Sequence, residues 1–337
     1  MHKNELHYDL PDAAIAQEPI EPRDAARLLD TRTSTDHRFK ELPDLLAPGD
    51  LVVVNTTRVR QARLLGAKAA SGGEVELLLL DHRGGDRWDA LVRPARRVRE
   101  GLEIEVGDTT VTVISPPDEG KVIVEIPGDA EVLMEAYGEV PLPPYIRSGI
   151  ESPERYQTVY GQILGSAAAP TAGLHFTQAV LDGLAQRGVE VAHVDLHVGL
   201  DTFRPITTDR VEDHDMHSEF YEVPAATVDA VHRTWNGGGR VVAVGTTVVR
   251  SLESAAGAGR LAPSSGYTRL FITPGFRFRV VDLLITNFHV PGSSLLAMVS
   301  AFMGPEWRDT YAQALRSGYR FLSFGDAMLA ARSDRAG

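Results

Sequence analysis

DLVVVN, residues 50–55, is a short run of apolar, mostly β-branched side chains that ends at polar residues. Such a run predicts a buried strand. The segment that follows has a different pattern, and runs of this buried type return from about residue 160. Because the strand finds no partner of its own kind in the intervening segment, we predict a domain that is interrupted by an insertion.

The segment from about residue 62 to 126 is rich in short β-type runs and has no strong helix pattern. Tight turn signals such as SGG, RGGD and GD separate the runs. The six runs are ARLLGAKA (62–69), EVELLLLD (74–81), RWDALVR (87–93), LEIEV (102–106), TTVTVI (109–114) and KVIVEI (121–126). Six short strands favour a small antiparallel barrel, because closure removes exposed edges. PLPPYI (141–146) then predicts an extended strap, since each proline fixes its φ angle.

From about residue 160 onward, strand and helix patterns alternate. Thr177 is a good capping residue for a helix that ends near Arg187. The other predicted helices are 225–235, 246–256, 293–303 and 307–317, and the predicted strands are 189–198, 240–245, 268–273, 280–286 and 319–324. This alternation predicts an α/β fold with a parallel or mixed sheet.

The predicted architecture is therefore a discontinuous α/β domain with an inserted small antiparallel β-barrel domain. The α/β domain comprises residues 1–60 and 148–337, and the barrel comprises residues 61–147. The length of 337 residues is sufficient for two domains and a large core. We expect the protein to be a monomer.

The composition excludes several classes of protein. The chain has no cysteine, which rules out disulfides, thiolate nucleophiles and Cys-based metal sites. No apolar run approaches the length of a membrane span, and the first residues, MHKNELHYDLPD, are too polar for a signal peptide. The cytoplasm is therefore the expected location. The net charge of −12 argues against indiscriminate binding of polyanions.

A local excess of positive charge nevertheless lies between Arg58 and Arg99. Ten Lys and Arg residues stand against five Asp and Glu residues there, a balance of +5. One interpretation is a solvated domain surface, and the other is a docking site for a nucleic acid. The arginines that we consider for the second interpretation are Arg58, Arg60, Arg63, Arg93, Arg96, Arg97 and Arg99.

Polar motifs follow several of the predicted strands of the α/β domain. They are DLHVGLDTF (195–203), GTTVVR (245–250), NFHVPGSS (287–294) and SFGDAM (323–328). In open α/β sheets, ligands bind beyond the carboxyl ends of the strands, where loops and helix N-termini converge. We therefore expect these motifs to meet at one edge of the sheet.

Seven of the eleven histidines lie between His175 and His289, close to these motifs. In AAPTAGLHF (168–176), His175 and Thr171 belong either to a loop closed by a capping histidine or to a ligand loop in which His175 exchanges a proton. His193 and His232 receive no role, because they lie within an ordinary strand and helix pattern.

EDHDMHSE (212–219) places His214 and His217 three residues apart among acids. Nearby carboxylates favour imidazolium, so we expect raised pKa values for these two histidines. The alternatives are a solvated acidic turn and a His/carboxylate metal site. GTTVVR is either a simple threonine cap or a ligand site formed by Thr246, Thr247 and Arg250. Asn287 either closes a turn or recognises a base edge or ribose, and His289 stands two residues further on.

Taken together, these segments resemble the S-adenosylmethionine:tRNA ribosyltransferase-isomerase family of queuosine biosynthesis. The resemblance spans nearly the whole chain in consistent order. Its motifs are YDLP, IAQEP, EPRDAARLL, NTTRV, GGEVELLLL, PLPPYI, RYQTVY, AAPTAGLHF, LHVG, DHDMHSE, AVGTT, LITNFHVP, VSAF and YRFLSFGDAM. It implies a discontinuous α/β domain with an inserted β-barrel, as predicted above.

The resemblance also implies an activity. The ribosyl carbons of S-adenosylmethionine would be transferred to 7-aminomethyl-7-deazaguanine in a tRNA, giving epoxyqueuosine with release of adenine and methionine. S-adenosylmethionine would be a co-substrate, and neither a further cofactor nor a metal is expected. Such chemistry needs a base for the carbon beside the sulfonium, an acid for adenine, and an acceptor for the proton of the tRNA amine.

On this basis we predict roles for the motif residues. The predicted proton-transfer residues are His175, His214, His217 and His289, with Glu219 as orienter or alternative base. The predicted substrate-binding residues are Thr171, Thr246, Thr247, Arg250 and Asn287, and the arginines between Arg58 and Arg99 are predicted to contact the tRNA backbone.

The chain departs from the family pattern at three positions. The family usually has Gly at the position of Asp201, Pro at that of Gln61 and a larger apolar residue at that of Ala297. Asp201 adds bulk and charge beside the predicted pocket, so a divergent paralogue with another acceptor is one alternative. A His/carboxylate metallohydrolase and a non-catalytic RNA-binding module are the others.

Overall fold

The computed structural model describes residues 1–150, 152–199, 205–257 and 259–335. The chain forms two compact units, one of Met1–Arg58 with Pro143–Gly337 and one of Val59–Leu142. The second unit begins two residues before and ends five residues before the barrel domain expected at 61–147. Those domain boundaries stay a prediction.

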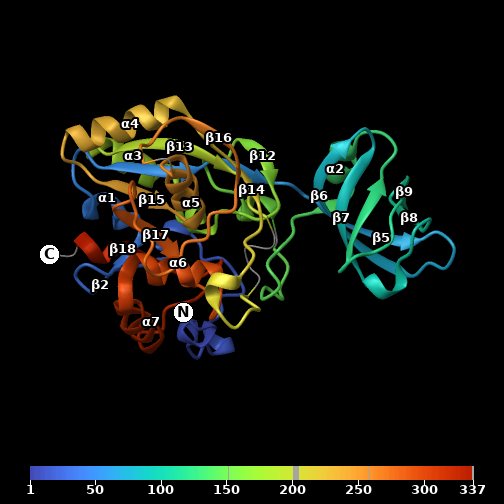
Figure 1. Ribbon diagram of the computed structural model, residues 1–337, viewed down its shortest axis with the longest axis horizontal. Helices are drawn as coiled ribbons and strands as arrows, with labels where there is room; N and C mark the ends of the chain where they lie inside the picture. Colours follow the sequence, from blue (N-terminus) through green and yellow to red (C-terminus); the bar gives the residue numbers. More distant parts are fainter. Residues whose placement is uncertain (151, 200–204, 258, 336–337) are drawn as a thin grey trace. The chain divides into compact units, whose positions relative to one another are not determined.

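The larger unit is built on a nine-stranded mixed sheet (Figure 1). Its strands, in spatial order, are β16 (Ser264–Thr268), β14 (Glu219–Val223), β13 (Glu190–Leu196), β3 (Leu51–Asn55), β15 (Val241–Val244), β17 (Leu283–Asn287), β18 (Ala327–Ala331), β1 (Arg27–Asp30) and β2 (Thr35–Arg38). The four central strands β13, β3, β15 and β17 are mutually parallel, whereas β14 and β18 run antiparallel to their neighbours β13 and β17. The predicted mixed α/β fold is confirmed.

The strand at the centre of the fold is β3, from the run DLVVVN. Leu51 and Val53 belong to the core on one face of the sheet, and Val52 and Val54 to the core on the other. All four side chains are fully buried. Successive side chains of a strand point to opposite faces, so an unbroken apolar run is needed where both faces are covered. Each such side chain contributes about 1.5–3 kcal/mol by burial.

Helices cover both faces of this sheet. One face packs against α1 (Leu42–Leu45) and α3 (Gln178–Gln186), and Thr177 caps α3 as predicted. The other packs against α4 (Ala225–Asn236), α5 (Thr246–Ala255), α6 (Ser294–Met303) and α7 (Trp307–Arg316). Within the described ranges, none of the helices is long and apolar enough to cross a membrane.

Two predicted strands are misplaced. The strand expected at 268–273 lies at 264–268. The strand expected at 319–324 is wrong, because β18 begins only at Ala327. Leu322 has a φ of 68°, which ends any extended run, and Phe321 is buried by stacking on Phe288 with ring centroids 4.7 Å apart. Aromatic packing, not a strand ladder, explains this apolar segment.

The smaller unit contains the predicted closed antiparallel barrel. Its six strands are β5 (Arg63–Lys68), β6 (Glu74–Gly84), β7 (Arg87–Arg93), β10 (Lys121–Glu125), β9 (Thr109–Val113) and β8 (Glu103–Val106), and β5 pairs with β8 to close the ring. A Cβ at Gly66 would lie 2.7 Å from the Glu105 carbonyl oxygen, so closure depends on glycine there. The sequence prediction missed helix α2 (Ala130–Tyr137), strand β11 (Gly138–Glu139) and the separate pair β4 (Thr57–Val59) and β12 (Ile163–Ser166).

Candidate active site

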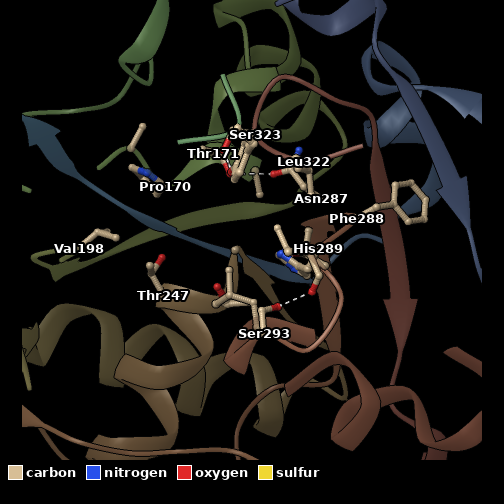
Figure 2. A pocket seen from close by; sticks show the side chains of 18 residues that line it. Pro170, Thr171, Val198, Thr247, Asn287, Phe288, His289, Ser293, Leu322 and Ser323 are labelled. Atoms are coloured by element: carbon tan, nitrogen blue, oxygen red, sulfur yellow. Dashed lines mark hydrogen bonds between the residues drawn. The ribbon is translucent and has the colours of Figure 1, made fainter. Parts of the chain in front are cut away.

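A polar pocket lies where the central strands end. Strands β15 and β17 end at Val244 and Asn287, and the residues directly after them line the pocket. Strand β18 runs antiparallel to β17, with Ala327 opposite Asn287, so the residues before β18 reach the same edge. The polar lining residues are Tyr145, Thr171, Thr246, Thr247, Thr286, Asn287, His289, Ser293 and Ser323. Figure 2 shows the labelled members around the cavity, with Phe288 turned away from it.

The tight turn into α5 brings main chain to the pocket. Gly245 has a φ of 85°, a left-handed conformation that side-chain-bearing residues rarely adopt. This turn sets the first residues of α5, Thr246 and Thr247, directly against the cavity. The first-turn N–H groups of a helix carry partial positive charge, so this end of the pocket favours electron-rich groups.

Thr171 and Asn287 meet across the pocket although 116 residues separate them. The Thr171 hydroxyl donates to Oδ1 of Asn287 at 3.0 Å, and Nδ2 of Asn287 donates to the Asp326 carbonyl at 3.3 Å. Thr171 is the first residue of the 3-10 helix η7 (Thr171–His175), which follows Pro170. The structure thus brings the predicted substrate-binding residues Thr171, Thr246, Thr247 and Asn287 to one cavity.

His289 is the predicted proton-transfer residue that lines this pocket. Its Nε2 lies 2.8 Å from the Thr286 hydroxyl, and its main chain is held by Tyr8 and Tyr311. Burial lowers the pKa of His289 to about 3. The ring is therefore neutral at pH 7, which suits hydrogen bonding to a ligand better than storage of a proton.

His175 is buried and is not among the residues that line the pocket. Its ring stacks on Phe39, and its two nitrogens lie 3.0 Å from the Ala172 carbonyl and 2.9 Å from the Gly325 carbonyl. Burial lowers its pKa, although the two carbonyls oppose this effect. The ring therefore ties η7 to the turn before β18, and both of these segments contribute residues near the pocket.

A second polar cluster joins His217, Glu219 and Arg250. His217 Nε2 lies 3.0 Å from Oε1 of Glu219, which also accepts the Gly199 N–H at 2.8 Å. Arg250 donates to the other oxygen, Oε2. Glu219 and Arg250 are buried, whereas 15% of the His217 side chain is exposed. Burial lowers the pKa of Arg250 to about 10, so the guanidinium remains charged at pH 7.

Two segments of the chain contribute residues both to this cluster and to the pocket. Val198 lines the pocket, and the next residue, Gly199, donates to Glu219. Thr246 and Thr247 line the pocket, and Arg250 stands one turn further along α5. Asp201, the departure that most concerns this region, lies outside the described residues.

The expected rise of the His214 pKa is wrong. Burial of the half-exposed ring lowers its pKa, the neighbouring His217 lowers it further, and Asp215 only opposes this effect. The surrounding acids are engaged elsewhere: Glu212 with the chain's amino terminus, and Asp215 with Arg269. The negative charges of Glu212 and Asp215 are therefore largely neutralised by these partners and do little to stabilise a protonated His214.

Four polar lining residues were missed by the sequence prediction, namely Tyr145, Thr286, Ser293 and Ser323. Tyr145 and Ser323 face each other with their hydroxyl oxygens 2.6 Å apart, and Thr286 partners His289. Tyr145 belongs to the proline-rich strap, which carried no signal of chemistry. Within the described ranges, no three His, Asp or Glu side chains group as ligands for a metal, so the metallohydrolase alternative gains no support there.

The seven arginines considered for docking of a nucleic acid divide into two groups. Ion pairs with carboxylates engage Arg58 (Glu154), Arg60 (Glu131) and Arg63 (Glu76 and Glu139). The second group is exposed and forms no ion pair with any residue that the structure describes; its members are Arg93, Arg96, Arg97 and Arg99. Arg93 ends β7, Arg96 and Arg97 lie in the 3-10 helix η5 (Ala95–Arg97), and Arg99 follows two residues later.

Residues 3–330 match the family model described as "Queuosine biosynthesis protein". The chain is 49% identical to an S-adenosylmethionine:tRNA ribosyltransferase-isomerase of Symbiobacterium thermophilum, over 98% of this chain and 99% of that protein. Proteins with the same name from Heliobacterium modesticaldum and Moorella thermoacetica are 51% and 50% identical, over 96% and 98% of this chain and 97% and 99% of theirs. The crystal structure of an S-adenosylmethionine tRNA ribosyltransferase from Thermotoga maritima matches with a TM-score of 0.55 at 36% identity, over 96% of this chain and 99% of that one.

Proposed function

The chain belongs to the queuosine biosynthesis protein family, and we propose that it is an S-adenosylmethionine:tRNA ribosyltransferase-isomerase. One observation carries this proposal: relatives of that name are about half identical to the chain over nearly the full length of both. The polar pocket at the edge of the sheet supplies a place for a small polar donor.

In the proposed reaction, the ribosyl carbons of S-adenosylmethionine pass to the amine of 7-aminomethyl-7-deazaguanine in a tRNA. Adenine and methionine leave, and the tRNA gains an epoxycyclopentanediol, giving epoxyqueuosine. S-adenosylmethionine is consumed as a co-substrate, and we propose no other cofactor. Because the acceptor is a tRNA, the proposed location of the protein is the cytoplasm. The proposed assembly is a monomer.

His217 is the proposed base, oriented by Glu219. When Nε2–H donates to the carboxylate, Nδ1 is the nitrogen that accepts a proton. Arg250 and the Gly199 N–H also donate to Glu219, which supports the carboxylate as an orienter more than as a base. His214, three residues from His217, is the second candidate for proton transfer.

The remaining predicted residues take binding and positioning roles in this proposal. His289, Thr171 and Asn287 hydrogen-bond the donor in the pocket, because all three line it and His289 is neutral. His175 positions η7, since both of its ring nitrogens lie against main-chain carbonyls. The arginines that form no ion pair with a described residue, Arg93, Arg96, Arg97 and Arg99, contact tRNA phosphates, and the paired Arg58, Arg60 and Arg63 contribute less.

The test is incubation with S-adenosylmethionine and a tRNA that carries the aminomethyl-deazaguanine base. Release of adenine and methionine, with a matching mass gain on the tRNA, is the expected result. Methyl transfer alone would contradict the mechanism. tRNA binding without turnover would favour an RNA-binding module, and adenine release that requires a different acceptor would favour a divergent paralogue. Activity that disappears with a chelator and returns with a metal would favour the metallohydrolase.

A further inference from the structure

Thr247 carries a buried hydroxyl that lines the pocket and has no hydrogen-bond partner among the residues that the structure describes. Only 7% of the residue is exposed. In Figure 2 its oxygen points toward the cavity. A buried hydroxyl without a hydrogen-bond partner lowers the stability of the protein by about 1–3 kcal/mol. A ligand that accepts a hydrogen bond from this hydroxyl therefore gains a favourable interaction.

The same hydroxyl stands in the first turn of α5, a helix of ten residues. Gly245 precedes this helix and provides no side-chain cap, whereas Ser293 caps α6 at the same pocket. The first-turn N–H groups of α5 therefore carry partial positive charge toward the cavity, and no side chain in the described part of the protein caps them. A hydroxyl donor beside such N–H groups is the arrangement that recognises an anionic oxygen.

The charges around the pocket narrow the choice of ligand group. The described lining contains no Lys, Arg, Asp or Glu, and His289 is neutral. Arg250, on the same helix, is held by Glu219 and by the Leu270 carbonyl. The N-terminus of α5, which lacks the side-chain cap that α6 has, is therefore a positive feature of this lining, and it fits one small anion better than a polyanion.

We propose that Thr247 and the first-turn N–H groups of α5 bind the carboxylate of the methionine part of S-adenosylmethionine. This inference rests on the proposed function, because it assigns one end of the proposed donor. One carboxylate oxygen accepts a hydrogen bond from the Thr247 hydroxyl, and the other accepts from the helix N–H groups. A phosphate of the tRNA has similar chemistry, and the experiment separates the two sources.

The experiment combines the isosteric variant Thr247→Val with decarboxylated S-adenosylmethionine, which lacks only the carboxylate. A hydrogen bond to a charged group predicts a rise of about 10- to 100-fold in the KM for S-adenosylmethionine in the variant. The wild type should prefer S-adenosylmethionine to the decarboxylated compound, and the variant should lose most of that preference. Thr247→Ser, which keeps the hydroxyl, should restore it, and the KM for tRNA should not change.

Ser251→Ala is the matched control. Ser251 is buried on the same helix, and its hydroxyl donates to the Thr247 carbonyl at 3.0 Å outside the pocket lining. This variant should keep the wild-type preference. An equal loss of activity toward both donors in Thr247→Val would overturn the proposal, and a raised KM for tRNA alone would assign the site to a phosphate.

Calorimetric binding of S-adenosylmethionine separates this inference from the proposed function. Suppose that neither the wild type nor Thr247→Val modifies tRNA. Weaker binding of S-adenosylmethionine to Thr247→Val than to the wild type would then support the carboxylate site, although the proposed reaction had failed. Equal binding to both proteins would overturn the carboxylate site whatever the reaction.

Discussion

The Nε2 atom of His217 lies 3.0 Å from Oε1 of Glu219, and the second oxygen of that carboxylate accepts from Arg250. The His217 side chain is partly exposed, whereas the side chains of Glu219 and Arg250 are buried. The imidazole is therefore the accessible member of the cluster, and the buried ion pair holds it in place. An imidazole held in this way has one defined tautomer. This relationship makes the cluster the first target for mutagenesis.

Glu219→Gln should lower kcat by about 10²–10⁴, the range for loss of acid–base assistance. The amide can still accept from Arg250, but it cannot stabilise imidazolium on His217. Leaving a buried guanidinium without its counter-ion should also lower the free energy of unfolding by about 3–5 kcal/mol. Adenine release as a function of pH and urea unfolding are the two measurements.

Glu222→Gln is the control for this variant. Glu222 lies on the same strand, β14, but is exposed. It should change neither kcat nor stability by more than a small amount. A normal kcat in Glu219→Gln would remove the cluster from the mechanism.

Thr171→Val should weaken donor binding through Asn287. The variant leaves Oδ1 of Asn287 without the hydrogen bond that Thr171 donates, which costs about 1–3 kcal/mol. We expect a KM for S-adenosylmethionine about tenfold higher, with a smaller effect on kcat. Thr33→Val, at an exposed threonine that is not part of the pocket lining, is the control, and an unchanged KM in Thr171→Val would contradict the role of this pair.

His289 should make stability depend on pH in acid. Its pKa is about 3 in the folded protein and about 6.5 when unfolded, so the unfolded chain takes up a proton that the folded protein refuses. Stability is therefore lost as pH falls from 6.5 toward 3, by up to about 1.4 kcal/mol per pH unit from this one group. In His289→Gln this contribution is absent.

The measurement is urea unfolding of the wild type and His289→Gln at pH 7 and pH 5. The stability advantage of the wild type should shrink at pH 5. His193→Gln, at an exposed histidine of β13, should show no such change. A constant difference between wild type and His289→Gln would contradict the buried, neutral ring.

Arg96→Glu with Arg97→Glu should weaken tRNA binding by tenfold or more and make it less sensitive to salt. Each lost phosphate contact lowers the slope of log K against log salt by about 0.7–0.9. The control carries the same change of charge on exposed arginines that are already paired, Arg187→Glu with Arg233→Glu. Equal tRNA affinity of the Arg96/Arg97 variant and the wild type would contradict the proposal that these arginines bind tRNA.

Local patterns predicted most of the fold, because periodicity and capping act within a few residues. Thr177 caps α3, and the six runs between 62 and 126 form the six strands of the barrel. The prediction failed where long-range packing overrides local pattern, as at Phe321 and Leu322. SFGDAM reached the predicted edge of the sheet for another reason, since it precedes an antiparallel strand and does not follow a parallel one.

The sequence by itself determined the family, the mixed α/β fold and the set of polar residues near the strand ends. Only the tertiary structure decided which of them act together, because burial and partners depend on residues far away in the chain. It placed His289 in the pocket lining, placed His175 against the Gly325 carbonyl outside that lining, and paired His217 with Glu219. It also showed which candidate arginines form ion pairs with carboxylates and which do not; Arg93, Arg96, Arg97 and Arg99 form none with the described residues. The sequence could not make this distinction, because all of these side chains have the same chemistry.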